Sequence, residues 1–197
     1  MEPDAVEIRV LGCLIEKQRT TPDAYPLSLN SLRLACNQAT SRDPVVDYDE
    51  ALIRAALERL SRKGWVRLAS GAGSRAAKYR HLLDSALSLD GAELSLLAVL
   101  MLRGPQTPGE LKQRTERLHA FEPGEVDVRL LRLGERELTT RLSRRPGQKE
   151  ERFAQLLGEH EEGQAPPEAT QASSSLEERV ARLEEEVARL RDEFAAR

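Results

Sequence analysis

The feature that most constrains the fold of this chain is an internal repetition of apolar, polar and turn residues. Thr21-Pro22 corresponds to Thr107-Pro108. Ahead of each hairpin, the offset between matching positions is 73 residues; the matches are Ile53, Leu57 and Leu60 with Val126, Leu130 and Leu133. Across each hairpin the offset is 74; the matches are Leu68, Gly73, Tyr79, Leu82 and Leu83 with Leu142, Gly147, Phe153, Leu156 and Leu157. One residue inserted at a turn reconciles the offsets, so the sequence predicts a structural duplication.

The first copy reads as three helices followed by a two-stranded hairpin. Apolar residues at helical spacing predict helices over 4–18 and 29–38, the second capped by Ser28. A third helix is predicted after Asp47 and Glu50, which have capping-box spacing, and it ends at Gly64. Short strands are predicted at 65–68 and 78–82, around a flexible tip at 71–74. This order is that of a winged helix, a variant of the helix-turn-helix motif.

The second copy repeats this order. Asp90 and Glu93 predict the cap of a helix that runs to about Arg103, and Thr107 with Glu110 predicts the start of the next. A third helix over 123–136 and a hairpin with its tip at 145–148 complete it. The predicted fold class is therefore mainly α with small β-hairpins (α+β), with two tandem winged-helix domains at 1–87 and 88–157.

The remaining residues predict a linker and a coiled coil. Residues 158–174 have no apolar period and are expected to be a disordered linker. Residues 175–197 form a heptad pattern with Val or Phe at a and Leu at d, which favours a parallel pair of helices. The candidate dimerisation residues are Leu176, Val180, Leu183, Val187, Leu190 and Phe194. The alternative is an amphipathic helix that packs on its own domains.

Charge and cysteine content narrow the function classes. Residues 1–87 hold 13 basic against 11 acidic side chains, residues 88–157 hold 12 against 11, and residues 158–197 hold 5 against 11. Neither domain has the basic excess usual in nucleic-acid binders, which weighs mildly against DNA. Cys13 and Cys36 lie in apolar helical contexts and are expected to be buried thiols. No signal peptide or membrane-spanning run is recognised, so a cytoplasmic location and no membrane partner are expected.

No catalytic constellation stands out in the sequence. His81, His119 and His160 are far apart, and the common nucleophile, phosphate-loop and zinc motifs are missing. The acidic side chains are interspersed with basic ones on predicted helix surfaces. We therefore expect no enzymatic activity, no cofactor and no metal.

Basic side chains on the two predicted wings are the candidates for nucleic-acid binding, because flexible cations on hairpins suit phosphate contacts that set position rather than sequence. These candidates are Arg67, Arg75, Lys78, Arg80, Arg141, Arg144, Arg145 and Lys149. The starts of the third helices, which would enter the major groove, are acidic instead. Their acidic residues are Asp47, Asp49, Glu50, Glu122, Glu125 and Asp127. Carboxylates there would repel phosphates, so conventional groove reading is not expected.

Several short motifs resemble the YceH family of uncharacterised bacterial proteins. In chain order they are residues 11–17 (LGCLIEK), 20–22 (TTP), 25–30 (YPLSLN), 35–38 (ACNQ), 42–45 (RDPV), 102–107 (LRGPQT), 109–111 (GEL) and 145–150 (RPGQKE). The resemblance covers roughly residues 5–157 and implies tandem winged helices, but it implies no activity. The polar segments 25–28 and 36–43 fit either a specific surface or ordinary loop chemistry.

Two functions follow from this reading. The first is a dimeric, wing-assisted DNA-binding or transcription-associated protein. The second is a protein–protein interaction scaffold that binds no nucleic acid, because fold does not fix function. The acidic third helices and the acidic tail favour the second.

Overall fold

The computed structural model describes residues 2–69, 77–144 and 150–159, which lie in one compact unit, Met1–Glu161. The predicted hairpin tips at 71–74 and 145–148 fall outside the described residues. So do the predicted linker at 158–174, apart from its first two residues, and the predicted coiled coil at 175–197.

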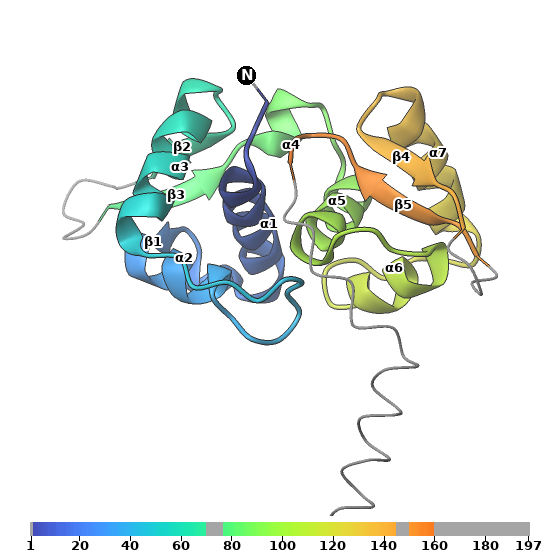
Figure 1. Ribbon diagram of the computed structural model, residues 1–197, viewed down its shortest axis with the longest axis horizontal. Helices are drawn as coiled ribbons and strands as arrows, with labels where there is room; N and C mark the ends of the chain where they lie inside the picture. Colours follow the sequence, from blue (N-terminus) through green and yellow to red (C-terminus); the bar gives the residue numbers. More distant parts are fainter. Residues whose placement is uncertain (1, 70–76, 145–149, 160–197) are drawn as a thin grey trace, which may run out of the picture. The chain divides into compact units, whose positions relative to one another are not determined.

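The first copy of the repeat forms three α-helices and a three-stranded antiparallel sheet (Figure 1). Its elements in chain order are α1 (Ala5–Thr20), the 3-10 turn η1 (Pro22–Ala24), β1 (Leu27–Ser28), α2 (Leu29–Cys36), α3 (Glu50–Arg62), β2 (Val66–Leu68) and β3 (Lys78–His81). β3 lies between β1 and β2. The third strand, β1, is an addition to the predicted hairpin.

The short helix α4 (Leu83–Ala86) leads into the second copy, which has the same order. Its elements are α5 (Gly91–Arg103), α6 (Pro108–Thr115), α7 (Glu125–Glu135), β4 (Thr139–Leu142) and β5 (Arg152–Gln155). Gln106 forms an isolated antiparallel bridge with Phe153, where the first copy pairs Leu27 of β1 with Tyr79. The α+β, winged-helix-like architecture is therefore confirmed, and the element order of the first copy, with this extra strand contact, recurs in the second.

Side-chain caps fix where the helices begin. Ser28 caps α2, and Asp90 with Glu93 forms a capping box on α5, as predicted. The cap predicted at Asp47 is wrong: Asp49 is the N-cap of α3, and its Oδ1 accepts from the Leu52 N–H at 2.8 Å. Asp47 instead accepts from the side-chain amide of Asn37. Sequence spacing allowed both carboxylates, because a capping motif does not say which backbone residue is extended.

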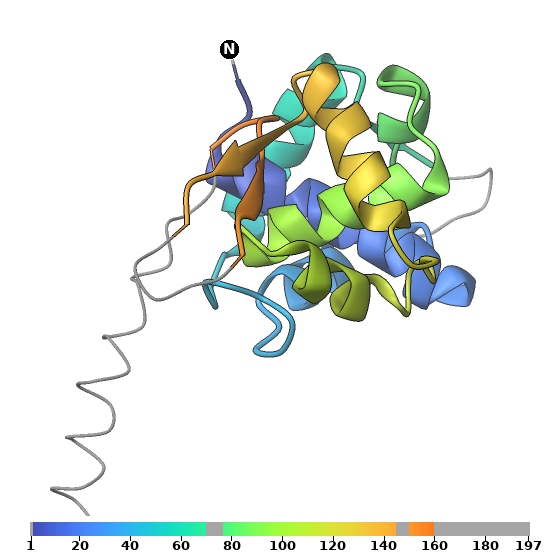
Figure 2. The same cartoon turned by 90° about the vertical axis from the view of Figure 1, so that its right-hand side faces the viewer.

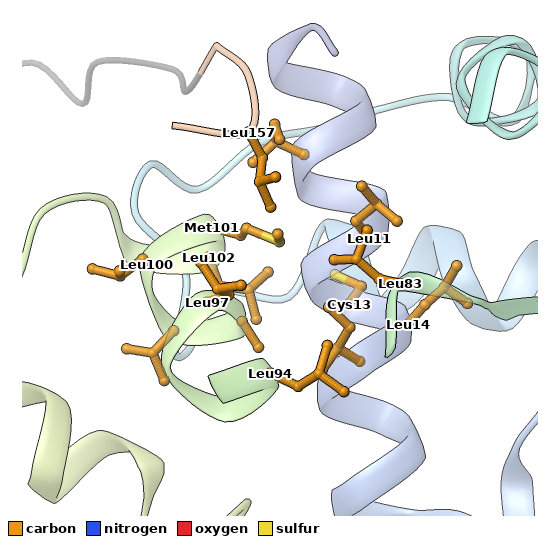
Figure 3. Packing of buried hydrophobic residues seen from close by; sticks show 14 of the residues in the cluster. Leu11, Cys13, Leu14, Leu83, Leu94, Leu97, Leu100, Met101, Leu102 and Leu157 are labelled. Carbon is orange, nitrogen blue, oxygen red and sulfur yellow. The ribbon is translucent and has the colours of Figure 1, made fainter. Parts of the chain in front are cut away.

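The two copies share one core, built on the contact between α1 and α5. These helices lie side by side between the two hairpins (Figures 1 and 2). Figure 3 shows buried side chains of α1, such as Leu11 and Cys13, in one cluster with those of α5, such as Leu97 and Met101. Gly12 permits the close approach, since a Cβ there would lie 2.9 Å from Leu102 Cγ. The predicted boundary between domains, at residues 87 and 88, falls between α4 and α5 and stays a prediction.

The loop between α2 and α3 is tied down by buried polar contacts. Arg42 has no exposed side-chain surface and donates to both carboxylate oxygens of Glu16, at 2.9 and 3.0 Å. Its Nε also donates to the carbonyl of Ala35 at 3.1 Å. The Asp43 N–H donates to the Leu102 carbonyl of α5 at 2.9 Å. The polar 36–43 segment is therefore fixed against both copies of the repeat.

Candidate nucleic-acid interface

The first wing, β2 and β3, brings basic side chains into register. Arg67 lies directly opposite Arg80, and Lys78 pairs with Ser28 on the other side of β3. Arg67 and Lys78 are exposed and Arg80 is half-buried. Neither strand contains a carboxylate. Within the described residues, Arg67 and Arg80 form no ion pair. Among the described strand residues of the two wings, this cross-strand pair of like charges has no carboxylate to neutralise it.

The opposite face of this wing is anchored in the core. His81 is buried, and its backbone N–H donates to the Tyr25 hydroxyl at 2.9 Å. Its ring Nε2 lies 2.7 Å from Gln18 Oε1. Burial, more than the nearby Arg80 charge, lowers the pKa of His81 to about 4, and burial raises the pKa of Tyr25 to about 12. Both rings are therefore neutral near pH 7, and the positive charge of the wing lies on its outer face.

The second wing, β4 and β5, carries an ion pair of its own. Arg141 forms an ion pair with Glu151 at 3.1 Å, and its guanidinium lies 5.7 Å from the centre of the Phe153 ring. Arg144 is exposed just beyond β4. The other candidate wing residues, Arg75, Arg145 and Lys149, lie outside the described residues. The strands of the two wings therefore differ in how far their arginines are neutralised, and a count of charged residues in the sequence does not reveal this difference.

The third helices of the two copies, α3 and α7, also differ in whether their basic side chains are neutralised. On α3, Arg54 and Arg62 are exposed, and with Tyr79 and Glu58 they line a shallow groove against β3. Sequence spacing did not predict this groove. The alternation of Tyr79 with Lys78 and Arg80 was the available signal, because side chains along a strand point to opposite faces.

On α7, the basic charge is used internally. Arg129 bonds Asp90 and Glu125, so its guanidinium is already neutralised. The outward face of α7 is partly apolar, since Val128 is 49% exposed and Leu131 is 55% exposed. Such a face does not match the charge of a DNA groove.

The two cysteines are buried, as predicted. The Cys13 thiol beside it, together with burial, raises the pKa of Cys36. In the described part of the chain, no group of three or more His, Cys, Asp and Glu side chains is placed to hold a metal ion. None of the described helices is long and apolar enough to cross a membrane.

These elements and contacts define an α+β protein with two winged-helix-like halves, and the described strands of its first wing carry a cross-strand arginine pair. Comparison with known proteins identifies the family. A family model described as "Protein of unknown function, DUF480" matches residues 4–148, and the chain belongs to this family. This agrees with the resemblance seen in the sequence.

Relatives extend the match to most of the chain. A UPF0502 protein of Azotobacter vinelandii is 50% identical over 160 residues, which cover 81% of this chain and 71% of the relative. A UPF0502 protein of Shewanella amazonensis is 46% identical over 193 residues, covering 90% and 92%. One from Serratia proteamaculans is 46% identical over 197 aligned residues, covering 91% of each chain.

Proposed function

We propose that this protein is a non-enzymatic, dimeric DNA-binding protein, associated with transcription, that contacts phosphates mainly through its first wing. The observation that carries the proposal is the cross-strand pair of Arg67 and Arg80. Like charges placed directly opposite on a sheet destabilise it by a fraction of a kcal/mol, up to about 1 kcal/mol. A phosphate bound beside each of the two guanidinium groups would screen this repulsion and supply the missing counter-charge.

The contrast between the wings supports the assignment to the first. Arg141 would have to leave Glu151 before it could bind a phosphate, whereas Arg67 and Arg80 have no such competitor among the described residues. Exchange of one ion pair for another gains little free energy at an exposed site. The first wing is therefore the stronger phosphate ligand.

The charges on the third helices favour binding that does not depend on the DNA sequence. Asp49 and Glu50 stand at the start of α3, where a recognition helix would meet the bases. Arg54 and Arg62 lie further along the helix, in the groove beside the wing. Such an arrangement favours backbone contacts, which position a protein on the duplex without reading its sequence.

A pair of matched variants tests the proposal. Fluorescence anisotropy would follow a labelled random duplex with the wild type, with Arg67→Thr/Arg80→Thr, and with Arg141→Thr. Threonine is chosen because it suits strands. We expect the first-wing variant to bind more weakly and its salt slope to fall by about two, one for each phosphate that the variant no longer binds.

Arg141→Thr is the control on the second wing, and we expect its affinity to stay close to the wild type. Equal affinities for all three proteins would refute the wing mechanism. A larger loss of affinity for Arg141→Thr would show that the second wing, and not the first, binds the phosphates.

Dimerisation is proposed from the sequence alone, because the heptad residues lie outside the described part of the chain. Light scattering after size-exclusion chromatography should give twice the 22.0 kDa of one chain. Leu183→Asp, at a d position, should shift the mass to that of one chain. A wild-type mass of 22.0 kDa at micromolar concentration would refute the proposal.

A specific observation favours a second candidate, a protein–protein interaction scaffold. The exposed Val128 and Leu131 of α7 lie near the carboxylate of Asp127 in sequence, and Arg129 is neutralised. This surface fits a protein partner better than a nucleic acid. Recovery of one stoichiometric protein partner by the wild type but not by Leu131→Asp, together with no DNA binding at low salt, would select the scaffold.

A further inference from the structure

A pocket of about 150 Å³ opens where the two copies of the repeat meet. Its walls come from the end of α1, the loop after α2, the second half of α5 and the end of α6. Four basic side chains line it. They are Lys17, Arg103, Arg114 and Arg117. These cations converge on the pocket from α1, α5, α6 and the turn after α6.

The one carboxylate in the lining is already bonded. Glu16 accepts two hydrogen bonds from Arg42, and its Oε1 lies 3.2 Å from Lys17 Nζ. These contacts lower the pKa of Glu16 in spite of its burial. Lys17 also donates to Gln38 Oε1 at 3.2 Å. Glu16 and Lys17 therefore form a closed polar cluster with Arg42 on one wall, and the other cations need a different partner.

Arg103 and Arg117 are the un-neutralised pair. Within the described residues, neither guanidinium has a hydrogen bond or an ion pair. Burial, followed by the positive charges of Arg114 and Arg42, lowers the pKa of Arg103, while Glu16 and Asp43 oppose the shift. Arg114 and Arg42 therefore add positive charge around the half-buried Arg103.

Arg114 has a weak competitor. Its Nη2 lies 3.3 Å from Glu110, one turn earlier on α6, and both side chains are partly exposed. Exposed pairs of this kind contribute little to stability, so Arg114 can turn toward a stronger anion. Two guanidinium groups without partners and a third that is weakly held match the planar, forked recognition of phosphate or carboxylate.

The remaining wall is apolar. Val99 and Leu102 on α5 and Leu118 after α6 face the pocket. A cavity of about 150 Å³ can hold a molecule the size of benzene. An inorganic ion would leave this apolar wall without contacts.

We propose that the junction pocket binds a small organic oxyanion. Its phosphate or carboxylate head lies between Arg103 and Arg117, and its apolar part contacts Val99 and Leu102. Because both copies of the repeat contribute to the walls, the ligand stabilises their junction. This inference does not depend on DNA binding.

Thermal denaturation of the full-length protein tests the proposal. Phenyl phosphate, benzoate and inorganic phosphate would be titrated at constant ionic strength, with sodium chloride as reference. A ligand that binds only the folded chain raises the midpoint in a saturable way. We expect a rise with phenyl phosphate or benzoate that is larger than with inorganic phosphate, and the comparison of the first two identifies the head group.

Variants locate the site. Arg103→Gln/Arg117→Gln should abolish the rise, whereas Arg132→Gln, on the exposed face of α7, should leave it unchanged. The single change Arg117→Gln, at an exposed position, guards against loss of folding and should weaken the rise.

Two results would overturn the proposal. One is the lack of a saturable rise with either organic anion. The other is a loss of DNA affinity in Arg103→Gln/Arg117→Gln with no effect of any small anion on the wild type, which would assign these arginines to the phosphates of the duplex. Loss of DNA affinity in Arg67→Thr/Arg80→Thr alone leaves the pocket untouched, so the two proposals fail separately.

Discussion

Acidification from pH 7 to pH 5 should destabilise the protein through one side chain, His81. Its ring is buried under the first wing, and two neighbours fix the neutral form: Nε2–H donates to Gln18 Oε1, and Nδ1 accepts from the Leu83 N–H at 3.3 Å. A second proton on Nδ1 would remove the acceptor of the Leu83 N–H and place a charge in the core. Burial accordingly lowers the pKa of His81 from 6.5 to about 4.

The magnitude follows from this difference. Between pH 6.5 and pH 4 the unfolded chain binds a proton that the folded chain does not, so the free energy of unfolding decreases as the pH falls. The stabilisation is fully present above pH 6.5 and is lost progressively toward pH 4. Between pH 7 and pH 5 the loss amounts to about 2 kcal/mol.

Urea denaturation measures this loss, and the single tryptophan, Trp65, reports it from the start of the first wing. In His81→Gln, the amide can replace both hydrogen bonds without titrating. We expect the wild type to lose about 2 kcal/mol between the two pH values and the variant to lose much less. Equal losses in both proteins, or no loss in the wild type, would refute the assignment of a buried neutral imidazole.

Three further predictions concern the core and the caps. Gly12→Ala should lower the free energy of unfolding by about 1–3 kcal/mol, because the new Cβ would lie 2.9 Å from an α5 side chain. Gly134→Ala has its nearest atom 3.8 Å away and should instead stabilise α7 by up to about 1 kcal/mol. The urea midpoints of the two variants check this contrast. Arg42→Met should cost about 3–5 kcal/mol by leaving a buried carboxylate, and adding Glu16→Leu should restore most of the stability in the same assay. Asp49→Ala should lower the free energy of unfolding by about 1 kcal/mol, because the α3 cap is removed, and the thermal midpoint should fall with it. An unchanged midpoint would contradict the cap.

The repeated order of helices and hairpins could be predicted because it rests on local signals. Apolar periodicity and caps such as Ser28 and Asp90 are properties of a few neighbouring residues. Where two local solutions compete, sequence spacing does not decide. Asp47 and Asp49 both offer a carboxylate, and the backbone conformation at Asp49 selects it as the cap.

The candidate sites depend on contacts between residues that are far apart in the sequence. The sequence alone does not reveal such contacts. Arg67 and Arg80 look like ordinary wing cations until the register places them opposite each other. Arg141 looks equivalent until Glu151 is found beside it. The junction pocket required the packing of α1 against α5, which brings Arg103 to the loop after α2. The fold decides which residues lie opposite each other and which arginines are neutralised. A count of charged residues gives only the number of charges available.

The most direct test of the central claim is the affinity of the full-length protein for a labelled random duplex across a range of salt concentrations. Each phosphate contact contributes about −0.9 to the slope of log affinity against log salt. We expect binding at low salt with a slope of about −2 or steeper, because each phosphate that Arg67 or Arg80 neutralises releases a counterion condensed on the DNA. No binding at low salt, or binding that does not depend on salt, would contradict a wing that contacts phosphates and would favour the protein-interaction scaffold.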